Sequence, residues 1–112
     1  MADVPQRGDL VYLNFSPQSG HEQAGNRPAI VLSPELFNQH KFAAVCPITN
    51  QQKGYPFEVV LPQGLPITGV ILTDQVRTLD WRSRGLMIKG QAPKKITDMC
   101  LKNIGTFLTR SE

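Results

Sequence analysis

The sequence predicts a small, mainly β protein, in which a strongly bent antiparallel sheet or barrel is followed by one C-terminal helix. Two observations predict this fold class. Short apolar runs recur at near-regular spacing between turn-rich segments, which is typical of small all-β folds. Residues 93–108 instead repeat apolar side chains every four positions, as a helix does. We expect residues 1–112 to form a single domain with one compact core.

The first strand and a long loop open the chain. Residues 9–15 alternate loosely between apolar and polar positions and follow the turn residues Arg7 and Gly8, which predicts the first strand. Residues 16–26 are polar and contain two glycines and a proline, which predicts a loop. Connections in compact domains usually have about 4–6 residues. Longer loops often carry function, so this loop is a candidate site.

Arg27 stands where this loop meets the second strand. Pro28 restricts the residue before it to extended backbone and cannot donate a ladder hydrogen bond, so it suits the first position of a strand whose apolar run is 29–32. An arginine held at this junction can bind a phosphate, because its planar guanidinium offers several donors and stays charged. An ordinary surface arginine at a loop end is the alternative interpretation.

The remaining elements follow from similar local signals. Ser33 as a cap and Pro34 in the first position predict a helical turn through residue 37. Pro93 suits the first turn of the terminal helix. The apolar stripe of that helix consists of Ile96, Cys100, Ile104 and Leu108, widened by Met99, Leu101 and Phe107. Further strands are expected at 42–48, 57–61 and 69–73, with weaker ones at 76–81 and 86–88.

Charge is unevenly distributed along the chain. The net charge is +3, but residues 1–74 carry four basic and six acidic side chains, whereas residues 75–95 carry six basic and one acidic side chain. A basic segment on a small domain suggests an anionic partner, with nucleic acid first. A solvated basic face is the alternative.

Membrane and secretion signals are absent from the sequence as given. No apolar run approaches the roughly 20 residues of a membrane span, and the first residues lack the basic region and apolar core of a secretory signal. Cys46 and Cys100 lie in apolar runs, so we expect reduced core cysteines rather than a disulfide or a metal site. A cytoplasmic protein without membrane association is expected.

Polar residues at the predicted strand ends are the candidates for chemistry. No histidine or cysteine pair has a metal-binding spacing, and no glycine-rich phosphate loop leads into a helix. Thr49 by itself would be read as a hydroxyl that binds nearby backbone. The residues in question are Glu22, Arg27, Thr49, Asp74, Gln75 and Arg77.

Several short motifs occur together along the chain. They are Arg7-Gly8-Asp9-Leu10-Val11, His21-Glu22-Gln23-Ala24-Gly25, Arg27-Pro28-Ala29, Cys46-Pro47-Ile48-Thr49, Lys53-Gly54-Tyr55-Pro56-Phe57-Glu58-Val59, Gly69-Val70 and Asp74-Gln75-Val76-Arg77. With these blocks, spread over residues 7 to 90, the chain resembles the MazF/PemK family of toxins, the endoribonucleases of type II toxin–antitoxin pairs. The block from Lys53 to Val59 places it nearer the MazF branch.

This resemblance implies a small SH3-like barrel of the CcdB/PemK type and a homodimer. It implies sequence-specific cleavage of single-stranded RNA without a metal or other cofactor, so that cutting mRNA inhibits translation. It also implies an acidic antitoxin of the MazE type, whose tail would fold over the site, and DNA binding by the toxin–antitoxin complex. The cleavage motif is not given by the sequence, and an ACA-like target follows only from the branch.

The resemblance also assigns roles to individual residues. Arg27 and Thr49 match the family's catalytic pair, and Glu22 matches an acidic residue that is also needed for activity. With the RNA's own 2′-OH as nucleophile, the products would be a 2′,3′-cyclic phosphate and a 5′-OH. Glu22 would serve either as the general base or as a salt-bridge partner that positions Arg27. Contacts with RNA are expected from Phe15, Gln23, Asn50, Lys53, Gln75, Arg77, Arg82 and Arg84.

Two other functions would suit the same fold. One is a CcdB-like toxin that poisons a topoisomerase by binding it, and the other is a nucleic-acid-binding domain without catalysis. The pairing of Arg27 with Thr49 at loop and strand ends favours the enzyme.

Overall fold

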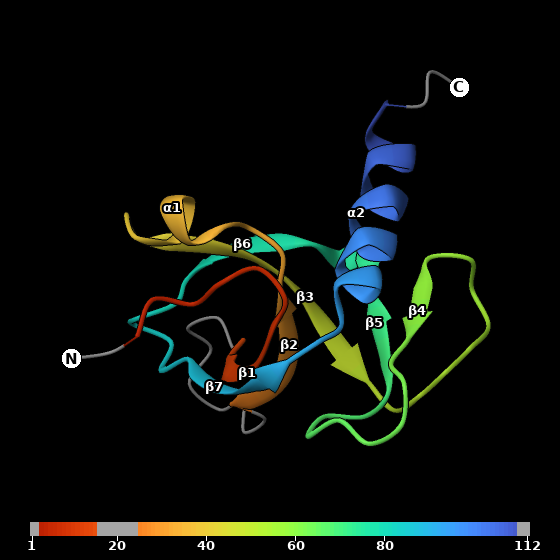
Figure 1. Cartoon of the computed structure of the whole chain (residues 1–112), viewed down its shortest axis with the longest axis horizontal. Coiled ribbons are helices and arrows are strands. Elements are labelled where there is room, and N and C mark those ends of the chain that lie inside the picture. The colour runs from red at the N-terminus through yellow and green to blue at the C-terminus, as the bar shows by residue number, and fades with distance from the viewer. Residues whose placement is uncertain (1–2, 16–24, 110–112) are drawn as a thin grey trace.

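Seven strands form an antiparallel sheet in the computed structural model, which describes residues 3–15 and 25–109. A long helix covers part of the sheet at the end of the chain (Figure 1). In chain order the elements are β1 (Asp9–Asn14), β2 (Asn26–Val31), α1 (Glu35–Asn38), β3 (Phe42–Thr49), β4 (Glu58–Val60), β5 (Val70–Leu72), the 3-10 helix η1 (Thr73–Gln75), β6 (Arg77–Asp80), β7 (Met87–Gln91) and α2 (Lys94–Thr109).

The strand β3 organises the sheet. The hydrogen-bonded order is β4-β5-β3-β2-β1-β7, and β6 pairs with the first half of β3. Figure 1 shows β3 crossing the middle of the molecule, from β6 at one end to β5 at the other. The predicted antiparallel sheet with a terminal helix is confirmed. In the described part of the chain the sheet bends strongly without closing into a ring. β4 and β7 are the ends of the main strand order, and β6 is a further edge strand beside β3.

A proline ends the pairing between β2 and β3. The last paired residues are Ala29 and Pro47. Leu32 N–H donates to Ala44 O at 2.8 Å. Residues that bond to the neighbouring strand alternate in an antiparallel pair, so the next two positions of β2 that would bond to β3 are residues 30 and 28. Pro28 has no N–H to donate there. We had expected Pro28 to be the first residue of the strand. It is instead the third residue of β2, and it marks the point where β2 and β3 separate.

Beyond this point β3 joins a different partner. Ile48 and Thr49 pair with Ile71 and Val70 of β5. Pro47 lies in the gap between the part of β3 that pairs with β6 and the part that pairs with β5, so its missing N–H leaves no ladder position empty. The change of partners separates the ends of β2 and β3 and makes room for a pocket.

Two apolar cores occupy opposite faces of the sheet. Alternation along β1 sends Leu10 into the first core, which α2 covers, and Val11 into the second core, which the bent sheet encloses. Trp81 is the largest side chain of the second core, and its indole N–H donates to Asn38 O at 2.8 Å. The two cores hold both ends of β3 in place.

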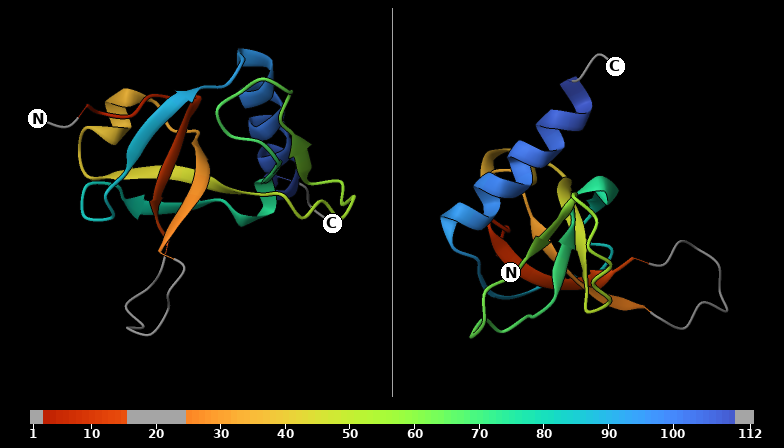
Figure 2. Two further views of the ribbon diagram at one scale, coloured as in Figure 1. Left: turned by 90° about the horizontal axis from the view of Figure 1, so that it is seen from below. Right: turned by 90° about the vertical axis from the view of Figure 1, so that its right-hand side faces the viewer.

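Only part of the predicted stripe on α2 is buried by this chain. Ile96 and Cys100 are buried in the first core and Ile104 packs against it, whereas Leu108 is 69% exposed. The views in Figures 1 and 2 show α2 rising away from the sheet towards its C-terminal end, which explains the difference. Neither described helix is long and apolar enough to cross a membrane.

The predicted role of Ser33 as a helix cap is wrong. Pro34 occupies the N-cap position of α1, and no side chain caps the helix. The Ser33 hydroxyl is buried, donates to Asn38 Oδ1 and accepts from Ala44 N–H at 2.8 Å. The hydroxyl therefore joins α1 to β3, where burial demands a hydrogen-bond partner.

The two cysteines are free and buried, as expected. Both belong to the first core. Burial raises the pKa of the Cys46 thiol and of the Cys100 thiol to about 12, because a thiolate is poorly stabilised away from water.

Candidate active site

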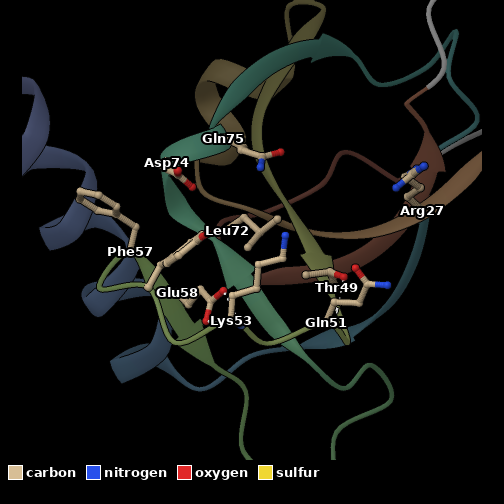
Figure 3. Close-up of a pocket in the computed structure, with 10 residues that line it drawn as sticks. Arg27, Thr49, Gln51, Lys53, Phe57, Glu58, Leu72, Asp74 and Gln75 are labelled. Carbon is tan, nitrogen blue, oxygen red and sulfur yellow. Dashed lines mark hydrogen bonds between the residues drawn. The ribbon is translucent and has the colours of Figure 1, made fainter.

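A pocket of about 300 Å³ opens where β2 and β3 separate (Figure 3). Its walls come from the start of β2, the end of β3, the loop 50–57, the start of β4, the end of β5 and η1. The lining residues are Arg27, Thr49, Gln51, Lys53, Tyr55, Phe57, Glu58, Leu72, Asp74 and Gln75.

Arg27 and Thr49 reach this pocket from neighbouring strands. The antiparallel register pairs Ala29 with Pro47, so the same register continued by two residues would set Arg27 opposite Thr49 on the same face of the sheet. Val31 and Val45, further along the same face, are buried in the second core. The two predicted catalytic residues thus lie just beyond the apolar part of one sheet face, on either side of the separation.

The Thr49 side chain is oriented by its own loop. Its hydroxyl oxygen accepts a hydrogen bond from Gln51 N–H at 3.1 Å. A threonine hydroxyl has one proton to donate, and this contact uses the oxygen as acceptor. The hydroxyl proton therefore stays available for a ligand oxygen in the pocket.

Arg27 presents its side chain at the surface of the protein. The residue is exposed, and within residues 3–15 and 25–109 its side chain forms no hydrogen bond or ion pair. Structural arginines usually bind carbonyl or carboxylate groups, as Arg7 does through its Nε donation to Leu32 O at 2.6 Å. Arg27 has the properties of a ligand-binding arginine rather than a structural one.

A carboxylate inside the pocket stabilises the loop that follows β3. Glu58 accepts backbone hydrogen bonds from Lys53 N–H at 3.0 Å and from Gly54 N–H at 2.9 Å. Gly54 has φ +80°, a left-handed conformation that glycine adopts without strain. These contacts fix the backbone of Lys53 in the pocket wall. They also occupy the Glu58 carboxylate with hydrogen bonds that hold the loop in place.

Comparison with known proteins identifies the family of this chain. The family model of PemK-like, MazF-like toxins of type II toxin–antitoxin systems matches residues 6–108. The chain belongs to this family. The resemblance seen in the motifs is thereby confirmed.

Individual relatives agree with this assignment and with the MazF branch. The endoribonuclease toxin MazF of Escherichia coli K12 is 50% identical over 95 residues, which cover 83% of this chain and 85% of the relative. The endoribonuclease PemK of Escherichia coli is 34% identical over 109 residues, covering 93% and 82%.

Solved structures show the same fold. The crystal structure of MazF from Deinococcus radiodurans superposes with a TM-score of 0.88 at 46% identity and covers 97% of this chain and 100% of its own. A MazE–MazF complex from the same organism gives a TM-score of 0.86 at 41% identity, covering 98% and 100%.

The structure brings only some of this toxin's predicted RNA-binding residues into the pocket. Lys53 and Gln75 line it with Arg27 and Thr49. Asn50 instead lines a neighbouring cavity of about 230 Å³, where its Oδ1 accepts from the Thr68 hydroxyl at 3.3 Å. Glu22 and Gln23 lie outside the described residues.

The other predicted contacts surround the end of β1 or the turn after β6. Phe15 is 7% exposed and belongs to the second core, so the structure does not present it as an open stacking surface. The Arg77 guanidinium lies 5.7 Å from the centre of its ring, and Arg84 Nη1 donates to Asn14 O at 3.0 Å. Arg82 lies 4.5 Å from the centre of the Trp81 ring. These three arginines do not line the pocket.

Five lining residues were not predicted, whereas Asp74, which also lines the pocket, was a candidate from the strand ends. The five come from the loop after β3 and from β4 and β5, and the polar residues at strand ends gave no indication of them. The Lys53–Val59 motif was the available signal, because it had already marked the loop as characteristic of the family. The five are Gln51, Tyr55, Phe57, Glu58 and Leu72.

Proposed function

We propose that the pocket containing Arg27 and Thr49 is the active site of this toxin, and that it cuts single-stranded RNA, mRNA above all, at short sequences. The observation that carries the proposal is the meeting of two side chains in one pocket, an arginine without a partner among the described residues and an oriented threonine hydroxyl. Relatives at 50% and 34% identity are named endoribonucleases. Cleavage of mRNA would inhibit translation and account for a toxin.

The reaction we propose uses the RNA's own 2′-OH as the nucleophile. The 2′ oxygen forms a new bond to phosphorus while the bond to the 5′ oxygen breaks. The 2′-OH proton passes to a base, and the leaving 5′ oxygen takes up a proton from the Arg27 guanidinium, which water then reprotonates. The products are a 2′,3′-cyclic phosphate and a 5′-OH end, and no external water is consumed in this step.

Arg27 and Thr49 would stabilise the charge that builds up on the phosphoryl oxygens. The guanidinium of Arg27 can donate two parallel hydrogen bonds to two oxygens, and the Thr49 hydroxyl can donate one more. A preorganised donor of this kind is commonly worth about 3–4 kcal/mol in the transition state. Arginine is a poor base, because its guanidinium is already protonated in the resting protein.

Glu22 is our proposed base or, equally, the partner that positions Arg27. The pocket's Glu58 already accepts two backbone N–H groups, which tie the carboxylate to the loop. It is thus poorly placed to move a proton.

Protein groups and the RNA's hydroxyl fill every role in this scheme, so we propose that cleavage needs no metal or other cofactor. Among the described residues, no three His, Cys, Asp or Glu side chains come together as a metal-binding group.

We also propose the partners and setting of the toxin. Structures of the related toxin from Deinococcus radiodurans contain MazE with MazF, and a basic segment from Arg77 to Lys95 would attract an acidic antitoxin of this type. A homodimer would cover the apolar side chains that α2 leaves exposed, such as Leu108. Reduced cysteines and an mRNA target suit the cytoplasm, and residues 1–112 suit one toxin domain.

The test is cleavage of synthetic RNA by the purified protein. Sequencing the 5′ ends of cut transcripts first gives the cleavage motif. An oligonucleotide with a single 2′-deoxy nucleotide at the cut should then resist cleavage while binding within about tenfold of the normal RNA, because phosphate and base contacts dominate affinity. A 2′-deoxy nucleotide two positions away is the matched control, and EDTA should not inhibit. Equal cutting of the deoxy-substituted RNA would exclude the 2′-OH mechanism.

A further inference from the structure

An exposed aromatic side chain lies in the pocket and has no role in the reaction as proposed. Tyr55, from the loop between β3 and β4, lines the pocket and keeps 58% of its surface exposed. An exposed ring in a nucleic-acid site can stack on a base, since every base has a π-face.

The loop that carries Tyr55 is fixed on its N-terminal side. The Glu58 carboxylate holds Lys53 N–H and Gly54 N–H, and Glu58 N–H in turn donates to Tyr55 O at 3.1 Å. Three hydrogen bonds within six residues leave the Tyr55 backbone little freedom. A ring held this way loses little entropy when a base stacks on it.

The same loop is fixed on its C-terminal side by contacts with distant elements. The Phe57 ring meets the Phe107 ring of α2 edge to face, with centroids 5.8 Å apart and planes at 85°. Phe57 O accepts from the Thr73 hydroxyl at 2.6 Å. η1 and α2 therefore support the position of Tyr55.

Charge separates the two sides of the pocket. Figure 3 shows Arg27 on one side and Phe57 and Asp74 on the opposite side. A carboxylate such as Asp74 only accepts hydrogen bonds, so it repels a phosphate but can accept from the amino or imino groups of a base. Phe57 and Leu72 add apolar surface on this side.

We infer that Tyr55 stacks on a nucleobase next to the cleaved phosphodiester, so that the pocket has a phosphate side at Arg27 and a base side at Tyr55. The inference rests on the proposed function, because it assumes that RNA occupies the pocket. It adds a base-binding subsite, with RNA as the ligand and Tyr55 as the residue on which the base stacks.

The experiment combines protein variants with RNAs that lack one base. A series of oligonucleotides carries a single abasic nucleotide at each position around the cut. Single-turnover cleavage is measured for the wild type, Tyr55→Ala and Tyr55→Phe, and Kd is measured with the same series made uncleavable by a 2′-deoxy nucleotide at the cut. Phe37→Ala is the control, because Phe37 is an exposed aromatic residue of α1 outside the pocket. Thermal melts show that each variant is folded.

We expect Tyr55→Ala to weaken binding and kcat/KM by about tenfold to a hundredfold, the usual size of one base–aromatic stack, while Tyr55→Phe and Phe37→Ala stay near wild type. Removing the base at one position should weaken RNA binding and cleavage by the wild type by a similar factor. The same change should hardly affect binding and cleavage by Tyr55→Ala. The inference fails if Tyr55→Ala is within twofold of wild type, or if every abasic penalty is the same in both proteins. If the wild type cuts no RNA, the proposed function fails. Kd measured with an abasic nucleotide at each position along an RNA that the protein binds then still decides whether Tyr55 stacks on a base.

Discussion

The backbone of Thr49 passes so close to Gly69 that no side chain fits between them. A Cβ atom built on Gly69 would lie 2.4 Å from Thr49 O, and Gly69 itself has φ +123°. Gly69 directly precedes Val70, which pairs with Thr49. The glycine thus lets β5 approach the strand end that carries the proposed catalytic hydroxyl.

Gly69→Ala should therefore impair catalysis as well as stability. The added methyl group must displace the Thr49 backbone, and misplacing a catalytic group by about 1 Å can cost a hundredfold in rate. Left-handed backbone adds about 1–2 kcal/mol of strain, which lowers Tm by roughly 5–10 °C. Single-turnover cleavage and thermal melts measure both effects.

Gly64→Ala is the matched control for this substitution. Gly64 has φ +92°, but a Cβ there would meet no atom within 4 Å. It should lose stability from backbone strain alone and cut RNA at the wild-type rate. If the Gly69→Ala protein also cuts at that rate, the close approach does not position Thr49.

Arg27→Lys should lower the single-turnover cleavage rate by about a hundredfold or more. Lysine keeps the charge but loses the planar fork, which is the loss of at least one preorganised donor. The salt dependence of binding should hardly change, because one cation replaces another. Arg82→Lys, an exposed arginine outside the pocket, is the control. A rate near that of the wild type would refute the bidentate contact.

Arg27→Ala and Thr49→Ala should each remove activity while leaving Tm nearly unchanged. Arg27 is exposed and unpartnered among the described residues, and Thr49 contributes no apolar packing to either core. The losses in the double mutant should be less than additive, since both groups act on one transition state. A large drop in Tm for Arg27→Ala would show that the arginine is structural.

The thiols should be inert in the folded protein and make its stability sensitive to alkaline pH. Burial raises the pKa of Cys46 and Cys100 from 9.0 to about 12. Between these values the unfolded chain loses thiol protons that the folded chain keeps, so the free energy of unfolding falls as pH rises from 9 to 12. Below pH 9 the thiols should have no effect.

Denaturant melts between pH 8 and pH 11 test this expectation, with Cys46→Ala and Cys100→Ala compared against the wild type. The slope of stability against pH should be shallower in each variant. Iodoacetamide should label neither thiol in the native protein and both after unfolding. Rapid native labelling would contradict the buried positions.

An acidic antitoxin should bind fast and with strong salt dependence. Attraction between an acidic disordered segment and the basic segment from Arg77 to Lys95 accelerates encounter, and salt screens it. Stopped-flow association should slow by about tenfold or more between low and high salt. Arg82→Gln should reduce this dependence, whereas Lys41→Gln, outside the basic segment, should not. Salt-independent association would count against the charge argument.

Much of the fold was predictable from local sequence. Alternating apolar residues and turn residues located all seven strands to within a few positions, because the period of a strand is a local property. The predicted strand at 29–32 missed the start of β2 at Asn26, because Asn26 and Arg27 are polar and lie beyond the buried part of the strand.

The proposed catalytic pair was also predictable, whereas the rest of the pocket was not. Family motifs and strand ends indicated Arg27 and Thr49. The same reasoning proposed Phe15 for RNA binding, but its ring is buried under Arg77. Tyr55 and Glu58 were missed, because nothing in their local sequence shows that the loop after β3 folds back beside Thr49.

The sequence by itself determined the strands, the terminal helix and the chemical types available at their ends, since these depend on neighbours along the chain. Only the tertiary structure decided that β3 leaves β2 at Pro28 and joins β5, and that Arg27, Thr49 and Tyr55 consequently share one pocket. Register and partner exchange depend on contacts between residues far apart in the chain, and no local period encodes them.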